Sequence, residues 1–395
     1  MERLPLAVLT TSYPLHPDSS SGIFVQRLVA SLPAPIEASV VVPADTAAEW
    51  PEKMAGIHVQ PFRYAPRAWR ILAHEPGGVP VALKRHRRLY LLLPVFLLAM
   101  LLALLRVARH AAAIQANWVI CGVVAGFVGK VLARPVVTTL RGEDVTRAQR
   151  SRLDRWLLNL CVRWSARVVG VSEAIVAWLR SEFPAQASKF LVIENGVHDA
   201  LLAMPRPIRH AHQPVELITV GSLIPRKGVD QIIGALAQLP RDAEWRLTVV
   251  GAGPEEQALR EQARAAGLSE QVRFLGALAP ERVADELAMA DLFVLASHAE
   301  GRPNAVLEAM AAALPVVATD IAGVNEIVQH ERTGLLFHDS DGATFVAHLH
   351  RLMNDPTLRA QFGENGRRWL VERGLTWAGT GRRYAAVFNE LLGRP

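Results

Sequence analysis

The sequence has little of what several classes of protein need. Of its 395 residues only two are cysteines, Cys121 and Cys161, and they lie too far apart to form a CxxC pair. This argues against a disulfide scaffold and a cysteine-based zinc site, and it fits a reducing compartment. The thirteen histidines form no HxxxH or HExxH pattern, and the chain has no GxSxG or Walker A motif. We therefore expect no protein-built metal site.

Acidic residues are missing from one stretch, between Pro80 and His110. This stretch holds six basic residues, Lys84, Arg85, Arg87, Arg88, Arg106 and Arg109. Its charge of +6 equals the net charge of the whole chain, so the remainder is neutral. An apolar run without a single charge, residues 89–105, lies between the basic residues. Basic residues that flank apolar ones indicate a membrane surface as a partner rather than a nucleic acid.

The apolar run at 89–105 has three interpretations. Its 17 residues contain Pro94, and the run is short of the ~20 residues that a spanning helix needs. A span would also separate the early strands from all later ones. We therefore expect a membrane-facing helix over 84–109 that packs partly on the core and partly on lipid. A purely buried core helix and a true span are the alternatives.

Short, β-branched apolar segments alternate with helical stretches along the chain. We expect strands at 4–9, 38–42, 118–120, 136–139, 166–171 and 190–193, and a second series at 215–220, 246–250, 272–274, 292–295 and 316–318. This pattern predicts parallel sheets with helices on both faces. The stretch 198–214 contains several prolines, and we expect it to be a linker. We therefore expect a first domain at 1–200, a second at 201–376, and a C-terminal helix at 377–395 that packs back on the first.

The most informative group of polar residues lies in EGRPNAVLEAMAAALP. Glu300 and Glu308 are eight positions apart, and Asn304 is a good N-cap for the helix that follows. The free N–H groups at the start of that helix, including those of Ala305 and Val306, would suit a diphosphate. The two carboxylates could then hold hydroxyl groups of two sugars. The alternative is a capped core helix with Glu308 in solvent.

A second group follows the expected strand at 215–220. The loop GSLIPRKG begins with Gly221 and Ser222 and carries Arg226 and Lys227. Ligands of open α/β sheets bind at the carboxyl ends of strands, where two cations could neutralise a leaving diphosphate. A solvated basic loop is the alternative. A later loop, VVGAGPE, lacks the third glycine of a dinucleotide fingerprint, which argues against a nicotinamide enzyme.

Two loops of the first domain also follow expected strands. Gly22 ends a serine-rich stretch and could let backbone N–H groups approach a phosphate. Arg141, Glu143 and Asp144 follow the strand at 136–139, so we expect them at the cleft between the domains. The alternatives are an ordinary surface loop and a helix whose first acidic residues pair with an arginine.

Taken together, these motifs are similar to those of a known family. The run EGRPNAVLEAMAAALPVVATDIAGVNEIV, with GSLIPRKGVD, VVGAGPE, VIENGV, SYPLHPDSSSGIF and VVTTLRGEDV, resembles the retaining glycosyltransferases of family 4. The resemblance extends over nearly the whole chain. It implies an α/β protein with the GT-B fold, in which two Rossmann-like domains with parallel sheets face each other across a cleft.

The resemblance also implies an activity, the transfer of a hexose-type sugar from a UDP- or GDP-linked donor with retained configuration and without a metal or other cofactor. Glu300 would contact the donor sugar, Glu308 the ribose and Lys227 the diphosphate, with Gly22 beside the donor phosphate. The acceptor would be a glycan or a lipid-linked molecule in polysaccharide or glycolipid biosynthesis. The enzyme would be cytoplasmic and peripherally bound to the inner face of the cell membrane.

Two positions depart from the family pattern. The family often has Gly-Arg before its lysine loop, whereas this chain has Ser222, so one phosphate cation is either missing or supplied by Arg226. The family often has His-Gly where this chain has Arg141-Gly142. Arginine cannot act as a general base at neutral pH, and Arg141 could instead pair with a phosphate. The departures motivate one alternative, a catalytically degenerate sugar-binding subunit; a GT-B nucleotide-sugar epimerase is another.

Overall fold

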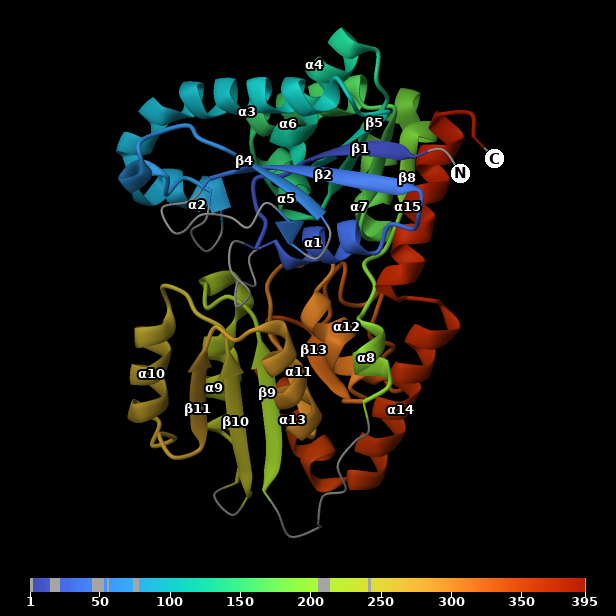
Figure 1. Cartoon of the computed structure of the whole chain (residues 1–395). Coiled ribbons are helices and arrows are strands. Elements are labelled where there is room, and N and C mark those ends of the chain that lie inside the picture. The colour runs from blue at the N-terminus through green and yellow to red at the C-terminus, as the bar shows by residue number, and fades with distance from the viewer. Residues whose placement is uncertain are drawn as a thin grey trace. The chain divides into compact units, whose positions relative to one another are not determined.

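The computed structural model describes residues 3–14, 22–44, 53–54, 57–73, 78–204, 214–240 and 243–394. The chain divides into two compact units (Figure 1). Unit 1 consists of Met1–Glu194 and Trp377–Pro395, and unit 2 consists of Asn195–Thr376. The boundary therefore lies between residues 194 and 195 rather than at residue 200.

Unit 1 is built on a sheet of eight strands in the order β3-β4-β2-β1-β5-β6-β7-β8. The strands are β1 (Leu4–Leu9), β2 (Ile36–Pro43), β3 (Lys53–Met54), β4 (Ile57–Phe62), β5 (Ala113–Asn117), β6 (Val136–Leu140), β7 (Arg167–Gly170) and β8 (Phe190–Val192). Every neighbouring pair is parallel except β3 with β4. The direction of the strand order reverses between β1 and β5, which is where open α/β sheets bind ligands.

Helices cover both faces of this sheet, and residues of β1 alternate between two cores. Ala7 and Leu9 share a cluster with α3 and α4, whereas Leu6 and Val8 share one with α1 and α15. The helices are α1 (Ile23–Ala30), α2 (Gly78–Arg85), α3 (Leu93–Ala108), α4 (Val119–Leu132), α5 (Glu143–Arg150), α6 (Arg152–Trp164), α7 (Glu173–Glu182) and α15 (Trp377–Leu391). Short 3-10 turns are η1 (Arg67–Trp69), η2 (Arg87–Leu92) and η3 (Pro184–Lys189).

The apolar run forms η2 and α3, and Pro94 lies in the first turn of α3, where its missing N–H costs no hydrogen bond. One face of α3 is buried in the core through Phe96, Met100, Leu104 and Ala108. The opposite face exposes large apolar side chains, namely Val95, Leu98 and Leu102, each more than half exposed at 51, 55 and 57%. We call these three residues, together with Leu91 at 82% exposure, the apolar stripe.

Of the described residues, one helical segment, Arg87–Ala108, is long and apolar enough to cross a membrane by length and composition. A buried core helix meets the same two criteria. The sheet adds a constraint, because β1 precedes this segment and β5 follows it, and the two strands pair in parallel from Leu6 with Ala113 onward. Both ends of the segment are therefore tied to one sheet.

Unit 2 is built on a wholly parallel six-stranded sheet, in the order β11-β10-β9-β12-β13-β14. The strands are β9 (Val215–Val220), β10 (Trp245–Val250), β11 (Val272–Gly276), β12 (Leu292–Leu295), β13 (Val316–Thr319) and β14 (Gly334–Phe337). Numbered within the unit, this is the order 3-2-1-4-5-6 of the doubly wound nucleotide-binding fold. The order reverses between β9 and β12, so the loops after these two strands flank the expected ligand site.

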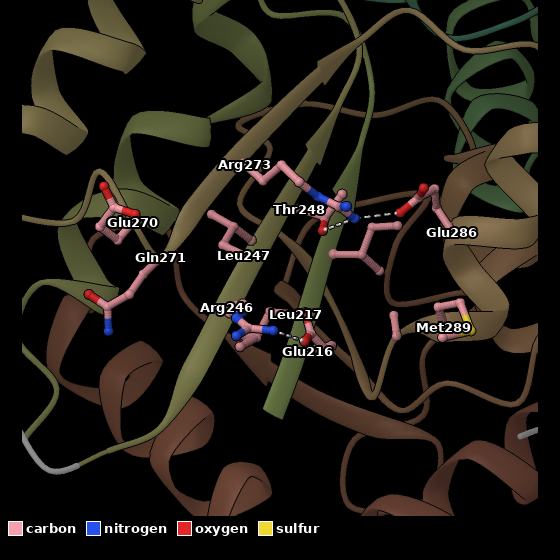
Figure 2. A pocket seen from close by; sticks show the side chains of 12 residues that line it. Glu216, Leu217, Arg246, Leu247, Thr248, Glu270, Gln271, Arg273, Glu286 and Met289 are labelled. Carbon is pink, nitrogen blue, oxygen red and sulfur yellow. Dashed lines mark hydrogen bonds and ion pairs between the residues drawn. The ribbon is translucent and has the colours of Figure 1, made fainter. Parts of the chain in front are cut away.

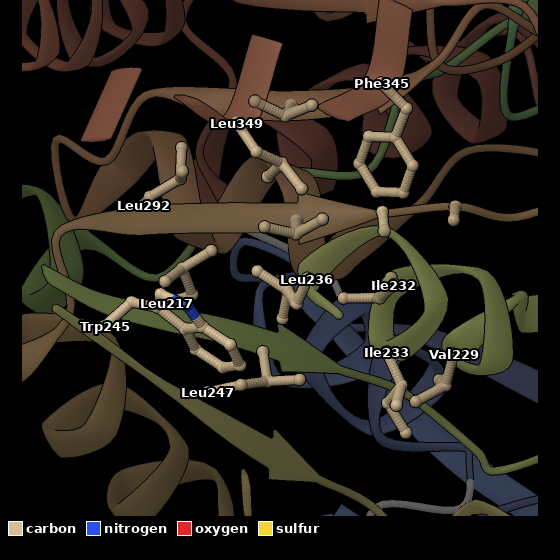
Figure 3. Packing of buried hydrophobic residues seen from close by; sticks show 14 of the residues in the cluster. Leu217, Val229, Ile232, Ile233, Leu236, Trp245, Leu247, Leu292, Phe345 and Leu349 are labelled. Atoms are coloured by element: carbon tan, nitrogen blue, oxygen red, sulfur yellow. The ribbon is translucent and has the colours of Figure 1, made fainter. Parts of the chain in front are cut away.

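The helices of unit 2 enclose the sheet between two apolar cores. They are α8 (Asp199–Leu202), α9 (Val229–Leu236), α10 (Glu256–Ala265), α11 (Pro280–Met289), α12 (Asn304–Ala311), α13 (Gly342–Asn354) and α14 (Pro356–Glu372), with the 3-10 turn η4 (Pro225–Lys227). Figure 3 shows one core, a single apolar cluster to which Leu236 and Ile232 of α9, Phe345 of α13 and Leu217 of β9 all belong. This packing fixes the start of α9, and with it the basic loop before that helix.

Four sequence-based expectations were wrong. The expected helix over 84–109 is divided, because α2 ends at Arg85, η2 covers Arg87–Leu92 and α3 begins at Leu93. Residues 118–120 are not a strand: β5 ends at Asn117, Trp118 has a φ of 69°, and α4 begins at Val119. The apolar residues continue across this turn, so periodicity could not locate it. Strands β3, β4 and β14 were not expected at all. Within the stretch 198–214, Asp199–Leu202 forms α8, whereas residues 205–213 lie outside the described residues.

Candidate active site

The two loops that flank the reversal of strand order in unit 2 bring Lys227 and Glu300 together. Lys227 ends the turn after β9, and Glu300 lies in the loop between β12 and α12. The Lys227 Nζ is 2.5 Å from the Glu300 Oε1. Gly228 makes this approach possible, because it has a φ of 60° and a Cβ there would lie 2.0 Å from the Ala296 carbonyl oxygen. The geometry therefore joins the two residues that the sequence singled out separately.

The Glu300 carboxylate is held from several sides and is only 7% exposed. The Ser297 hydroxyl donates to its Oε1 at 2.8 Å, and the Arg226 Nη1 lies 3.8 Å from its Oε2. Arg226 is itself positioned by donating to the Ala299 carbonyl at 2.7 Å. Two cations thus face one carboxylate, and the excess positive charge suits an anionic ligand.

Helix α12 follows Glu300, and its N-terminus differs from the expectation. Asn304 is the first helical residue and not the N-cap, which is Pro303, and its side-chain oxygen accepts a hydrogen bond from the Asn195 amide at 2.9 Å. The N–H of Val306 donates to the Pro303 carbonyl at 3.1 Å, so it is already engaged. Pro303 could replace Asn304 as the cap because proline fixes an extended entry into the helix.

The remaining predicted residues of unit 2 lie on these same loops. Glu308 is half-buried on α12, one turn after Asn304, and Ala305 lies at the start of that helix. Gly221 follows β9 directly, and a Cβ there would meet the Lys227 side chain at 3.5 Å. Ser222 is exposed beside it. The donor-binding candidates of unit 2 therefore lie in the loops after β9 and β12 and in the first turns of α12.

Unit 1 contains the other two candidates, at the ends of its own strands. Gly22 caps α1 with a φ of 69°, and a Cβ there would lie 2.4 Å from the Ser12 carbonyl oxygen. Arg141 follows β6, and its Nη2 donates to the Asn117 side-chain oxygen at 3.0 Å. Its guanidinium also lies over the Phe24 ring, 4.1 Å from the centroid. Desolvation lowers the pKa of Arg141 to about 10, so the group keeps its charge at neutral pH.

Asp144 links these elements, because its carboxylate accepts from the backbone N–H groups of Val119 at 3.1 Å and Arg141 at 3.4 Å. Desolvation nevertheless raises its pKa from 3.8 to about 6. The folded protein therefore binds this proton more tightly than the unfolded chain does. The free energy of unfolding should accordingly fall as the pH rises between about 4 and 6.

We expect the Asp144→Asn variant to lack this loss of stability, because an amide cannot ionise. The difference in Tm between the variant and the natural protein should grow in favour of the variant from pH 4 to pH 7. Thermal unfolding at a series of pH values measures it. Parallel Tm profiles for the two proteins would contradict the expectation.

A separate pocket of about 560 Å³ in unit 2 lies away from these residues. Figure 2 shows Arg273 between Thr248 and Glu286, with hydrogen bonds of 3.2 and 2.8 Å, and Arg246 beside Glu216 at 3.5 Å. Four charged side chains of this pocket form two ion pairs, Arg246 with Glu216 and Arg273 with Glu286. Among the residues that the structure describes, no group of three or more His, Cys, Asp or Glu side chains could hold a metal ion.

Sequence reasoning missed several residues that position the candidates. Ser297, Asn117 and Asn195 hold Glu300, Arg141 and Asn304 respectively. Asn117 is the last residue of β5, and Ser297 lies two residues after the end of β12. Their position at the end of a strand was the one feature of the sequence that could have indicated a role in the site. Asn195 belongs to the VIENGV motif, which pointed to the family but not to a contact.

Comparison with known proteins gives a consistent result. The family model "Glycosyltransferase Family 4" matches residues 22–201, and "Glycosyl transferases group 1" matches residues 203–369. A GDP-mannose-dependent phosphatidylinositol monomannoside mannosyltransferase of Mycolicibacterium smegmatis is 28% identical over 280 residues, which are 65% of this chain and 70% of the relative. An exopolysaccharide phosphotransferase of Streptomyces coelicolor is 33% identical over 200 residues. These residues are 50% of this chain but only 20% of the relative, so the chain matches a small part of that protein.

Solved structures share the fold. A sucrose-phosphate synthase from Thermosynechococcus elongatus has a TM-score of 0.79 at 22% identity, covering 99% of this chain and 100% of the other. Anabaena HepE in complex with UDP-glucose has a TM-score of 0.75 at 20% identity, covering 98 and 100%. These likenesses and the two Rossmann-like units confirm the GT-B fold class. The two family models together cover both units, and the chain belongs to glycosyltransferase family 4, the glycosyl transferases of group 1.

Proposed function

We propose that this glycosyltransferase moves a hexose-type sugar from a UDP- or GDP-linked donor to a glycan or lipid-linked acceptor, with retained configuration. The observation that carries the proposal is the group of Lys227, Arg226 and Glu300 at the reversal of strand order in unit 2. The relative from Mycolicibacterium is named for GDP-mannose and the structure from Anabaena holds UDP-glucose, which supports a nucleotide-sugar donor.

In the proposed reaction the bond between the sugar and the diphosphate breaks, and negative charge develops on the departing phosphate. Lys227 and Arg226 stabilise that charge, and the cost of reorganisation is small because Glu300 and the Ala299 carbonyl already hold them in place. Glu300 also orients the sugar, and Glu308 binds the ribose. The departing phosphate accepts the acceptor proton, so that no protein base is required. The two cations supply the charge that a metal ion would supply, and we propose that neither a metal nor another cofactor takes part.

We further propose that the protein is cytoplasmic and attaches peripherally to the inner face of the cell membrane. The apolar stripe on η2 and α3 supports this, because large apolar side chains there are exposed. Exposed arginines lie at both ends of the helix, Arg87 and Arg88 before it and Arg106 and Arg109 toward its end. Apolar side chains with flanking cations fit an interface of anionic lipids.

We expect a variant with Arg85, Arg87 and Arg88 replaced by glutamine to bind anionic vesicles about 100-fold more weakly, since each cation near such a surface contributes about 1 kcal/mol. Co-sedimentation with vesicles that contain phosphatidylglycerol measures the partition. The matched control replaces three exposed arginines of unit 2, Arg264, Arg332 and Arg368, and removes the same charge. Equal partition of the two variants would show that this patch does not bind the membrane.

The activity is tested with purified protein and a panel of UDP- and GDP-sugars, in the presence and absence of EDTA. We expect the protein to convert one donor to free nucleotide and a glycosylated product. NMR of the product should show the anomeric configuration of the donor, and EDTA should not lower the rate. A protein that neither binds nor consumes any donor contradicts the proposal. Interconversion of the sugar without an acceptor would indicate an epimerase instead.

A further inference from the structure

A second pocket lies within unit 1 and has a volume of about 500 Å³, in the range of ligand pockets. Two helical walls form its apolar part. Leu83 of α2, Tyr90 of η2 and Leu93 of α3 lie in one wall, and Leu153 and Leu157 of α6 lie in the other. The segments of the first wall precede β5 in the sequence, and α6, which forms the second wall, follows β6. The tertiary fold therefore builds this pocket, and no local motif predicts it.

The part of the lining that lies at the reversal of strand order in unit 1, which we call the floor, combines polar residues with the apolar Val119 and Ile120. Thr11 and Ser12 follow β1, and Trp118 follows β5, the two strands between which the order reverses. Asp144 and Glu143, at the start of α5, contribute carboxyl groups. This is the position at which an open α/β sheet places its ligand.

The charges on the floor restrict the ligand. Among the described residues, three carboxylates line the pocket, Glu143, Asp144 and Asp154, and the one arginine, Arg147, is already paired with Asp154 at 2.8 Å. Such a lining repels a phosphate and accepts hydrogen bonds from hydroxyl groups. The polar end therefore suits an uncharged, hydroxyl-bearing group such as a sugar ring.

The apolar end opens toward solvent, because Tyr90 is 55% and Leu153 is 65% exposed. Tyr90 is followed at once by Leu91, the first residue of the apolar stripe, so the apolar lining continues onto that surface. Exposed arginines adjoin both walls, Arg88 on η2 and Arg152 on α6. An aliphatic chain could thus pass from a lipid surface into the pocket over apolar side chains throughout, with cations at the entrance for the lipid phosphates.

We propose that this pocket binds the acceptor as an amphiphile, with a hydroxyl-bearing sugar at the floor and one aliphatic chain between α2–η2–α3 and α6. The inference rests on the proposed transferase function and names its acceptor class, a glycolipid. Chain length is then a determinant of specificity, and Leu153 and Tyr90 are binding residues that contact the chain.

The probes are octyl, decyl and dodecyl β-D-glucopyranoside, each kept below its critical micelle concentration and titrated into the full chain by calorimetry. Each buried methylene should tighten the Kd about three- to fourfold until the chain outgrows the pocket. We expect the Tyr90→Gln, Leu153→Gln double variant to lose this dependence on chain length. Both side chains are more than half exposed, so the variant should fold normally. The control is Trp156→Gln, an exposed apolar residue on the same helix that does not line the pocket.

A photoreactive diazirine at the end of the decyl chain locates the bound chain. Labelling of Leu83, Tyr90, Leu93, Leu153 or Leu157 supports the proposal. Labelling confined to Leu91 and 95–102 places the chain on the apolar stripe and overturns the pocket, as does a Kd that does not change with chain length. Binding of UDP and GDP is measured in parallel. If a nucleotide binds but no chain does, this inference fails alone, whereas failure of nucleotide binding removes the proposed function and leaves the lipid pocket standing.

Discussion

Replacing Glu300 by glutamine will lower kcat by about 10²- to 10³-fold, the size of effect that follows the loss of one preorganised charged partner in an active site. The carboxylate holds the Lys227 ammonium at 2.5 Å and is fixed by the Ser297 hydroxyl at 2.8 Å. An amide has nearly the same shape but no charge, so Lys227 loses the attraction that positions it. Initial rates with the donor that the natural protein consumes measure the loss.

The control for this variant is Glu331→Gln. Glu331 is also a carboxylate of unit 2 in an ion pair, with Arg351, but its side chain is 46% exposed and lies outside the candidate site. We expect its kcat to match that of the natural protein. A Glu300→Gln protein that folds, as judged by its Tm, and retains kcat within about threefold would rule out a role for Glu300 in the reaction.

Replacing Lys227 by methionine will lower kcat/KM for the donor by a similar factor and will weaken the binding of the free nucleotide diphosphate. The variant keeps an unbranched apolar side chain one atom shorter than that of lysine but removes the cation, which leaves the buried Glu300 with Arg226 at 3.8 Å as its remaining charged neighbour at the site. The site then presents one cation to the diphosphate in place of two. Calorimetry with UDP and GDP measures the affinity, and steady-state rates measure kcat/KM.

The exposed Lys130 of unit 1, replaced by methionine, is the matched control and should bind nucleotide normally. The double variant of Lys227 and Glu300 sharpens the test, because residues in direct contact are not additive. We expect the fold-loss of kcat/KM in the double variant to be smaller than the product of the two single fold-losses. Either single substitution already leaves the other residue misplaced, so the second substitution removes less. Strictly multiplicative losses would mean that the two residues act independently, contrary to the geometry.

The sequence was enough to predict the fold class and to single out Lys227 and Glu300 as candidates, which the structure places in contact. Lys227 and Glu300 each follow an apolar strand, and parallel strands place such residues at one edge of a sheet. Their contact could not be predicted, because it depends on β12 lying next to β9 although two other strands intervene in the sequence. Sequence also misplaced the cap of α12, since Asn304 and Pro303 both suit a helix start and the contact with Asn195 decides between them.

The composition of unit 1 has a consequence for how the chain folds during synthesis. Helix α15 covers one face of the unit 1 sheet through Tyr384 and Phe388, and the Tyr384 hydroxyl shares a 2.8 Å hydrogen bond with Thr139. Ribosomes make all of unit 2 before they make this helix. Leu6 and Val8 on that face therefore stay incompletely buried while unit 2 is being synthesised. Unit 2 is continuous in the chain and can complete its core before unit 1 does, although unit 1 is made first. The incomplete sheet of unit 1 exposes apolar residues during this time and is the part of the protein that we expect a chaperone to protect.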